Sequence, residues 1–295
     1  MGRSMQWLFH RAVENDDSGP PFWEGAAPHQ NLKRVLSTRR WIKCLHPFPH
    51  VRAENVFEPD WYSNLEAHFG KLLSAGLSEV PASNRFSRSI TGFDAYLLDL
   101  VPESAGPLRM FMSHEWHEMI SRTIGVHTSG DVLCSLHHHP ARSRNGKVHN
   151  DLNPGWFIDY PEHSGLVRVA QLDLCNYKTG RTSDQLLAAR ENVRAVAVLF
   201  YLNNHDWKLG DGGETGLYDS LTASVECPVI SVPPVNNSLL AFECTPFSFH
   251  SFIRNRKHPR NSFIMWLHCP IGDAINRWGR RSIAYWPGSS NGTVS

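Results

Sequence analysis

The run VRAVAVLFYLNN at residues 193–204 is one of several β-rich segments in the second half of this 295-residue chain. Its β-branched and aromatic residues favour a strand, and the closing Asn-Asn pair favours a turn. Further runs of this kind, broken by Gly, Pro and Asn, are DVLCSL, GLVRVAQLDL, ECPVISVPP, NSLLAFEC, FSFHSFI and NSFIMWLHCP. Many short strands of this texture predict a β-sandwich or a β-barrel.

Helical patterns precede these strands. Glu58-Pro59-Asp60 is typical of a helix start, and apolar residues then recur at helical spacing from Trp61 to Leu72. Residues 111–126, FMSHEWHEMISRTIGV, predict a second amphipathic helix with Ser113 as its N-cap. Residues 183–193, SDQLLAARENV, predict a third helix inserted between strands. The order of elements therefore predicts a mainly β protein whose core is buttressed by N-terminal helices.

Composition limits the class of protein. The mass of 33.4 kDa, with 41% apolar and 19% charged residues, suits one large globular domain. The formal net charge of +1 argues against a nucleic-acid partner. Six cysteines without a Cys-x-x-Cys motif, no apolar run of membrane-spanning length and no secretory leader favour a cytoplasmic protein.

A basic segment, Asn31–Lys43, stands apart from this even charge distribution. It carries five lysines and arginines between apolar residues. One interpretation is a patch for an anionic substrate or a membrane surface. The other is a strand or short helix with a solvated basic face.

Three residues have the chemistry of a non-haem iron site. His149 and Asp151 lie two positions apart in GKVHNDLNPGW, so on a strand they would point to the same side. His250, in the aromatic run FECTPFSFHSFI, offers a third ligand from a later strand. Two imidazoles and one carboxylate bind Fe(II) on one face and leave the other open. The alternative for His250 is a hydrogen-bonded core histidine.

Arg260 and Ser262 follow His250 at a spacing that favours recognition of a carboxylate. In an Arg-x-Ser pair on one strand face, the guanidinium donates a bidentate fork and the hydroxyl adds a donor. A keto-acid chelating iron at one end and clamped at the other would fit these residues.

From about Phe48 to His268 the chain resembles the Fe(II)/2-oxoglutarate-dependent dioxygenases, most closely their prolyl-4-hydroxylase-like branch. The resemblance rests on His149-x-Asp151 and on three segments, VLFYLNNHDWKLGDGGETGLY, SVPPVNNSLLAFECTPFSFHSF and RNSFIMWLH. It implies a double-stranded β-helix (jelly-roll, cupin-like) core, His149, Asp151 and His250 as iron ligands, and Arg260 and Ser262 as 2-oxoglutarate-binding residues. Gly212 and Gly213 would form a tight turn with close backbone approach, or a simple hairpin turn.

The chain departs from the family pattern in two places. A tyrosine that usually helps to bind 2-oxoglutarate is replaced by His137, His138 and His139, so either His139 donates instead or these residues form a surface cluster. The interval between His149 and His250 is also long. We expect an irregular arm at 1–30 and a single domain at 31–295, with a core at about 131–270 and an insertion at about 157–192.

The resemblance implies an oxygenase that hydroxylates an unactivated C–H bond and releases succinate and CO2. It would use Fe(II), 2-oxoglutarate and O2, with ascorbate as an optional reductant. The substrate would be a small polar or anionic molecule, because Arg142, Arg144 and Arg168 are expected near a pocket mouth lined by Trp156, Tyr160, His163 and Arg168. Alternatives are a prolyl or other residue of a peptide, a zinc site, or a non-catalytic jelly-roll binding protein.

Overall fold

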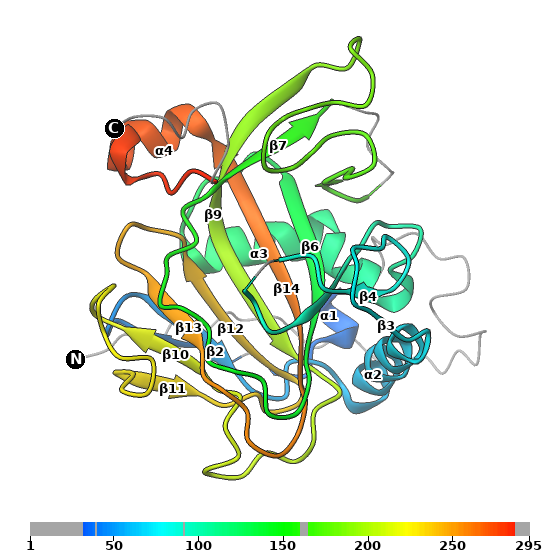
Figure 1. The fold of residues 1–295 in the computed structure, drawn as a ribbon, viewed down its shortest axis with the longest axis vertical. Helices are drawn as coiled ribbons and strands as arrows, with labels where there is room; N and C mark the ends of the chain where they lie inside the picture. The colour runs from blue at the N-terminus through cyan, green and yellow to red at the C-terminus, as the bar shows by residue number, and fades with distance from the viewer. Residues whose placement is uncertain (1–31, 39, 91, 160–164, 287–295) are drawn as a thin grey trace.

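The computed structural model describes residues 32–286 apart from 39, 91 and 160–164, so the predicted arm and the side chains of Tyr160 and His163 lie outside the described residues. The helical elements are α1 (Leu32–Val35), α2 (Pro59–Ser74), a 3-10 helix at Gly106–Met112, α3 (His114–Ile124), α4 (Ile271–Trp278) and a 3-10 turn at Arg280–Ser282. Apart from these, the described chain is dominated by strands (Figure 1).

The large sheet is built around three long antiparallel strands, β6 (Asp131–His139), β14 (Arg260–Pro270) and β9 (Ala189–Tyr201). Its main order is β1-β2-β12-β9-β14-β6-β5-β4-β3, with β7 added beside β9 and β8 beside β6. The remaining strands are β1 (Ile42–Cys44), β2 (His50–Ala53), β3 (Leu77–Ser78), β4 (Phe86–Ser87), β5 (Tyr96–Asp99), β7 (Pro154–Ile158), β8 (Arg168–Val169) and β12 (Ser238–Glu243).

A small three-stranded sheet lies against the large one. Its order is β11 (Ile230–Val232), β10 (Thr215–Tyr218) and β13 (Phe249–Phe252), all antiparallel. The two sheets are joined by buried contacts, such as the hydrogen bond between the hydroxyls of Tyr201 and Thr215 (2.8 Å). Two facing, largely antiparallel sheets confirm the predicted jelly-roll core with buttressing helices (Figure 1).

Helices α2 and α3 cover the face of the large sheet that turns away from the small sheet. Phe263 of β14 and Val198 of β9 pack there with Trp116 of α3 and Leu65 of α2 in one apolar cluster. Ser113 caps α3 as predicted, because its hydroxyl accepts a hydrogen bond from the backbone N–H of Trp116. Burial of this face leaves the opposite face of β6, β9 and β14 to line the space between the sheets.

The predicted helix at 183–193 is wrong. Residues 189–193 belong to β9 and pair with β7, from Ala189 opposite Ile158 to Val193 opposite Pro154. Helix-forming residues such as Leu187 and Ala188 favoured the helix in the sequence. Pairing with a strand that precedes it by about thirty residues overrides this local preference.

The basic segment forms a short helix (α1) and a strand (β1), and either element was expected if the segment is a solvated basic face. Arg34, Arg40 and Lys43 are exposed there. Among the described residues, no helix combines the length and the apolar character needed to cross a bilayer.

Candidate metal centre

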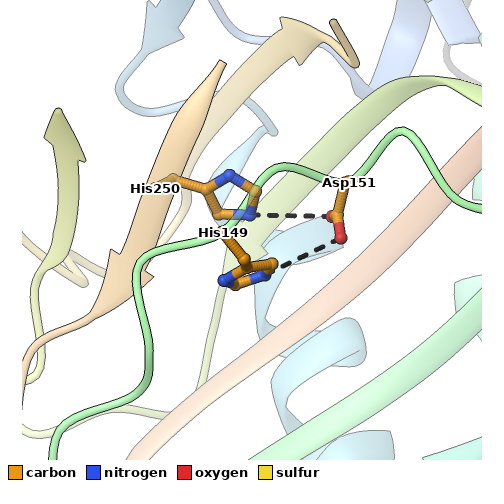
Figure 2. Close-up of side chains that lie close together, drawn as sticks. All are labelled: His149, Asp151 and His250. Atoms are coloured by element: carbon orange, nitrogen blue, oxygen red, sulfur yellow. Dashed lines mark ion pairs between the residues drawn. The ribbon is translucent and has the colours of Figure 1, made fainter. Parts of the chain in front are cut away.

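His149, Asp151 and His250 meet between the two sheets (Figure 2). Their candidate ligand atoms lie within 4.8 Å of one another. Nε2 of His149 is 3.7 Å from one oxygen of Asp151, and Nε2 of His250 is 3.6 Å from the other. His149 and His250 form an isolated β-bridge, so pairing between distant segments brings the three side chains together.

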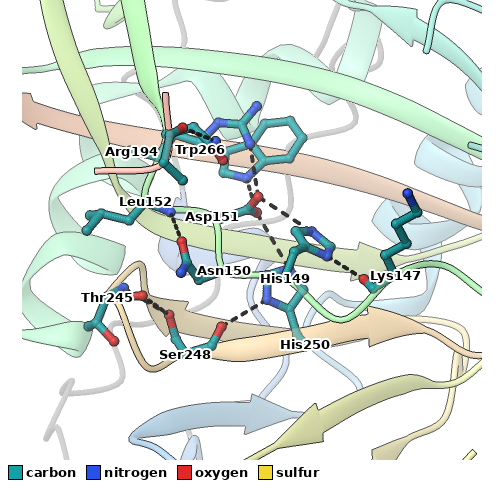
Figure 3. Close-up of polar contacts among 12 residues, drawn as sticks. Lys147, His149, Asn150, Asp151, Leu152, Arg194, Thr245, Ser248, His250 and Trp266 are labelled. Carbon is teal, nitrogen blue, oxygen red and sulfur yellow. Dashed lines mark hydrogen bonds and ion pairs between the residues drawn. The ribbon is translucent and has the colours of Figure 1, made fainter. Parts of the chain in front are cut away.

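Both imidazoles are oriented by backbone carbonyls. Nδ1 of His149 donates to the carbonyl of Lys147 (2.8 Å), and Nδ1 of His250 donates to the carbonyl of Ser248 (3.1 Å) (Figure 3). Because a carbonyl only accepts, the proton of each neutral ring is on Nδ1 and the Nε2 lone pair is available. Two Nε2 lone pairs and one carboxylate facing each other are a suitable donor set for Fe(II).

The carboxylate of Asp151 is buried and held at both oxygens. The guanidinium of Arg194 donates to Oδ1 (3.0 Å), and the indole N–H of Trp266 donates to Oδ2 (2.7 Å) (Figure 3). Burial alone would raise the pKa of Asp151, but the guanidinium of Arg194 keeps it well below its usual value. Asp151 is therefore ionised and ready to bind a cation.

A second polar site surrounds Arg260, which is 3% exposed. Its guanidinium donates to the hydroxyls of Ser262 and Thr215 (3.1 Å each), and Tyr201 bonds to Thr215 in turn. Its Nε is buried without a hydrogen-bond partner, and the ion pairs of the described residues include no carboxylate for Arg260. A buried guanidinium with an unused donor favours an anionic ligand.

His137, His138 and His139 all lie on β6 and are buried, so the interpretation as a surface cluster is wrong. His139 pairs with Arg260 across the sheet, stacks on Phe252 at 3.8 Å and donates through Nδ1 to a backbone carbonyl. Burial and the charge of Arg260 lower the pKa of His137 to about 3, and its Nε2 has no hydrogen-bond partner. His137 is thus a neutral ring beside Arg260 with an unused polar atom.

Residues 168–268 match the family model described as the 2OG-Fe(II) oxygenase superfamily. The matched range includes His250, Arg260 and Ser262 and begins after His149 and Asp151. Over this range, about a third of its length, the chain is similar to the 2OG-Fe(II) oxygenase superfamily. The match supports an oxygenase that uses Fe(II), 2-oxoglutarate and O2, and it disfavours the zinc-site and non-catalytic alternatives.

Solved structures with a similar fold include a prolyl-4-hydroxylase from Pseudomonas putida, at 14% identity and a TM-score of 0.49. That comparison covers 75% of this chain and 92% of the other. Another is a Trichoplax adhaerens prolyl hydroxylase in complex with a fragment of hypoxia inducible factor, at 16% identity and a TM-score of 0.48, covering 77% and 86%. A search of curated protein sequences finds no match.

The three arginines expected at the mouth of the pocket lie at two different places in the fold. Arg168 pairs with the buried carboxylate of Asp131 (2.9 Å). Arg142 lies in the turn after β6 and Arg144 just beyond it, past the strand end that carries His139 and Arg260. Arg168 is thus held by Asp131, and the other two lie near the Arg260 end of β6; that these arginines line a pocket mouth stays a prediction.

Four residues of the oxygenase site were missed by sequence reasoning: Arg194, Trp266, Tyr201 and Thr215. Tyr201 and Thr215 lie within a segment that carries the family resemblance, but hydroxyl residues are common on strands. Arg194 offered a stronger signal, because it is a charge inside the apolar run VRAVAVLFY and a buried charge needs a partner.

Proposed function

We propose that His149, Asp151 and His250 bind Fe(II) in this oxygenase. The observation that carries this proposal is the convergence of two Nε2 atoms and an ionised carboxylate within 4.8 Å. The side chain of His149 is 49% exposed, whereas those of Asp151 and His250 are 8% exposed. One side of the cluster is therefore accessible to a substrate, while the other is sealed by protein.

We further propose that Arg260 binds the distal carboxylate of 2-oxoglutarate. Ser262 and Thr215 fix the guanidinium, and its unpaired Nε provides a free donor. Of the two β6 histidines that face Arg260, His137 is a better partner for 2-oxoglutarate than His139. The polar atom of His137 is unused, whereas the ring of His139 is stacked and hydrogen-bonded.

Bound Fe(II), with 2-oxoglutarate and O2, would supply the oxidising power to hydroxylate a C–H bond, releasing succinate and CO2. The chain's own contribution is orientation and exclusion of water. Backbone carbonyls hold the two imidazoles, Arg194 and Trp266 hold the carboxylate, and Arg260 would fix the co-substrate. We propose a small polar or anionic molecule as the substrate, with a prolyl or other residue of a peptide as the alternative.

Binding experiments separate the two parts of this proposal. We expect His250→Ala to abolish anaerobic Fe(II) binding in isothermal titration calorimetry, because a facial set loses one of its three ligands. Arg260→Ala should keep Fe(II) binding and weaken 2-oxoglutarate by about 2–5 kcal/mol, because a buried carboxylate would lose its charged partner. Unchanged 2-oxoglutarate affinity in Arg260→Ala would contradict the assignment of Arg260.

The substrate is tested by turnover. Small acids, amino acids, sugars and prolyl peptides would be incubated with enzyme, Fe(II) and 2-oxoglutarate. Mass spectrometry should show a product heavier by one oxygen atom, formed in step with succinate. A product only from peptides would replace the small-molecule proposal with the peptide alternative. Adding ascorbate to matched reactions tests whether it sustains turnover.

A further inference from the structure

Arg194 and Trp266 hold the carboxylate of Asp151 from two directions. Each donates to a different oxygen, and Arg194 is itself 6% exposed. We infer that Arg194, anchored by Tyr177, is a positioning residue that fixes Asp151 for metal binding. The inference rests on the proposed assignment of Asp151 as a metal ligand, and it gives the predicted insertion, which contains Tyr177, a role at the metal centre.

An irregularity in β9 brings Arg194 to the site. Leu267 of β14 pairs with Val196 of β9, but the next residue, His268, pairs with Arg194. Ala195 is therefore an extra residue, as in a β-bulge. By simple alternation Arg194 would share the helix-covered face with Val196, because residues two apart point the same way. The bulge turns it to the face that carries Asp151.

A hydrogen-bond chain of fixed direction anchors Arg194. Nδ1 of His268 bonds to the backbone carbonyl of Asp131 (3.1 Å), so this nitrogen carries the proton and Nε2 accepts. Burial and the charge of Arg194 lower the pKa of His268 to about 3, which keeps the ring neutral. The hydroxyl of Tyr177 must therefore donate to Nε2 of His268 (2.6 Å) and accept from Nε of Arg194 (3.1 Å).

This hydrogen-bond chain requires an arginine at position 194. Nε of Arg194 donates to Tyr177, and one of its terminal nitrogens donates to Asp151. Its Cζ atom lies 3.9 Å from the ring centroid of Trp266, so the flat guanidinium covers that ring. A lysine ammonium would keep the positive charge but has neither the fork nor the flat face. Charge and geometry can therefore be separated by substitution.

Tyr177 is tightly fixed by its surroundings. It is 6% exposed, and its ring packs so closely on β7 that a Cβ at Gly155 would lie 2.3 Å from it. The backbone N–H of Trp156 also donates to the carbonyl of Tyr177 (2.9 Å). A residue held in this way can determine where the guanidinium of Arg194 lies.

The test uses two variants that leave every charge in place, Arg194→Lys and Tyr177→Phe. Co(II), an oxygen-stable substitute for Fe(II), is titrated into each full-length protein, with calorimetry for affinity and visible absorption for ligand geometry. We expect Arg194→Lys to weaken Co(II) about tenfold or more, and Tyr177→Phe to weaken it less, with altered Co(II) spectra in both. Matched controls are Arg122→Lys, an exposed pair on α3, and Tyr62→Phe, a hydroxyl on α2.

The outcomes are distinguishable. If the wild type binds neither Co(II) nor Fe(II), the proposed metal site fails and the positioning role fails with it. If the wild type binds Co(II) and both variants match it in affinity and spectrum, only the role of Arg194 is overturned. Thermal unfolding identifies a variant that does not fold, in which case the other variant decides. Lower thermal stability with unchanged Co(II) affinity would show a merely structural role.

Discussion

Gly212 and Gly213 form a turn next to Arg260 that no other residue type would fit without strain. Their φ angles are 78° and 85°, in the left-handed region. A Cβ on Gly212 would lie 2.1 Å from the carbonyl oxygen of Arg254, and one on Gly213 would lie 3.5 Å from the side chain of Arg260. The predicted close backbone approach is therefore present at Gly212, and the turn leads directly into Thr215.

Gly212→Ala tests this turn against Gly210→Ala, which shares a positive φ (91°) but has open space around the new Cβ. Both variants should lose about 1–2 kcal/mol from the left-handed backbone. We expect Gly212→Ala to lose more, and to raise the KM for 2-oxoglutarate, because its clash displaces the segment that carries Thr215. Urea unfolding and succinate assays measure the two effects. Equal behaviour of the two variants would contradict a role for this close approach.

The individual site residues were predictable where chemistry and spacing agree. His149, Asp151, His250 and Arg260 were predicted because few other roles explain these types in this order. Arg194 was not predicted, because strand alternation places it on the wrong face. A β-bulge depends on pairing between strands far apart in the chain and has no reliable signal in either strand alone.

At the scale of elements, β7 and β9 connect the predicted insertion to the metal centre. A Cβ added to Gly155 of β7 would lie 2.3 Å from the ring of Tyr177, and one added to Gly180 would lie 2.5 Å from the ring of Trp156. This packing explains why residues 189–193 form a strand despite a helical sequence pattern. Their partner strand, β7, is itself held in place by Tyr177.

Gly155→Ala should disturb the site by displacing Tyr177, because the added Cβ would meet both its ring and its hydroxyl oxygen (2.6 Å). The added methyl would lie 2.3 Å from the Tyr177 ring, so the ring and its bond to Arg194 must shift. We expect Co(II) affinity to fall to about the level of Tyr177→Phe, on the order of severalfold. Gly272→Ala on α4 is the control, because its Cβ meets nothing within 4 Å. That change should leave Co(II) binding unaltered and stabilise the helix by about 0.5–1 kcal/mol. Normal Co(II) binding by Gly155→Ala would mean that Tyr177 can shift without consequence.

At the scale of the whole molecule, the fold class was predictable because it depends on the number and order of strand and helix patterns along the chain. Apolar strand runs and two amphipathic helices indicate layers, whatever the exact ends of each element. The strand order was not predictable from these patterns, since β2, from the N-terminal part, inserts next to β12. The limits of the core and the insertion remain predictions.

The molecule buries several histidines in the neutral state, so its stability should depend on pH. Burial lowers the pKa of His117 to about 4 and, with the charge of Arg260 or Arg194, lowers those of His137 and His268 to about 3. In the unfolded chain each would titrate near 6.5. Between these values the unfolded state binds more protons, so stability is complete above pH 6.5 and falls as the pH decreases.

Each of these histidines should lower the free energy of unfolding by up to about 1.4 kcal/mol for each pH unit below 6.5. Urea midpoints measured between about pH 7.5 and 5 should therefore decrease steadily on acidification. His117 provides the cleanest test, because it lies on α3 and bonds to the hydroxyl of Thr128 (3.1 Å), which Gln can also reach. His117→Gln should reduce the slope of the unfolding free energy against pH by the equivalent of about one proton, because one neutral buried imidazole is removed. His127→Gln, at a side chain that is 84% exposed, is the matched control for the substitution itself. A wild-type midpoint that stays constant over this range would show that these rings gain protons without unfolding.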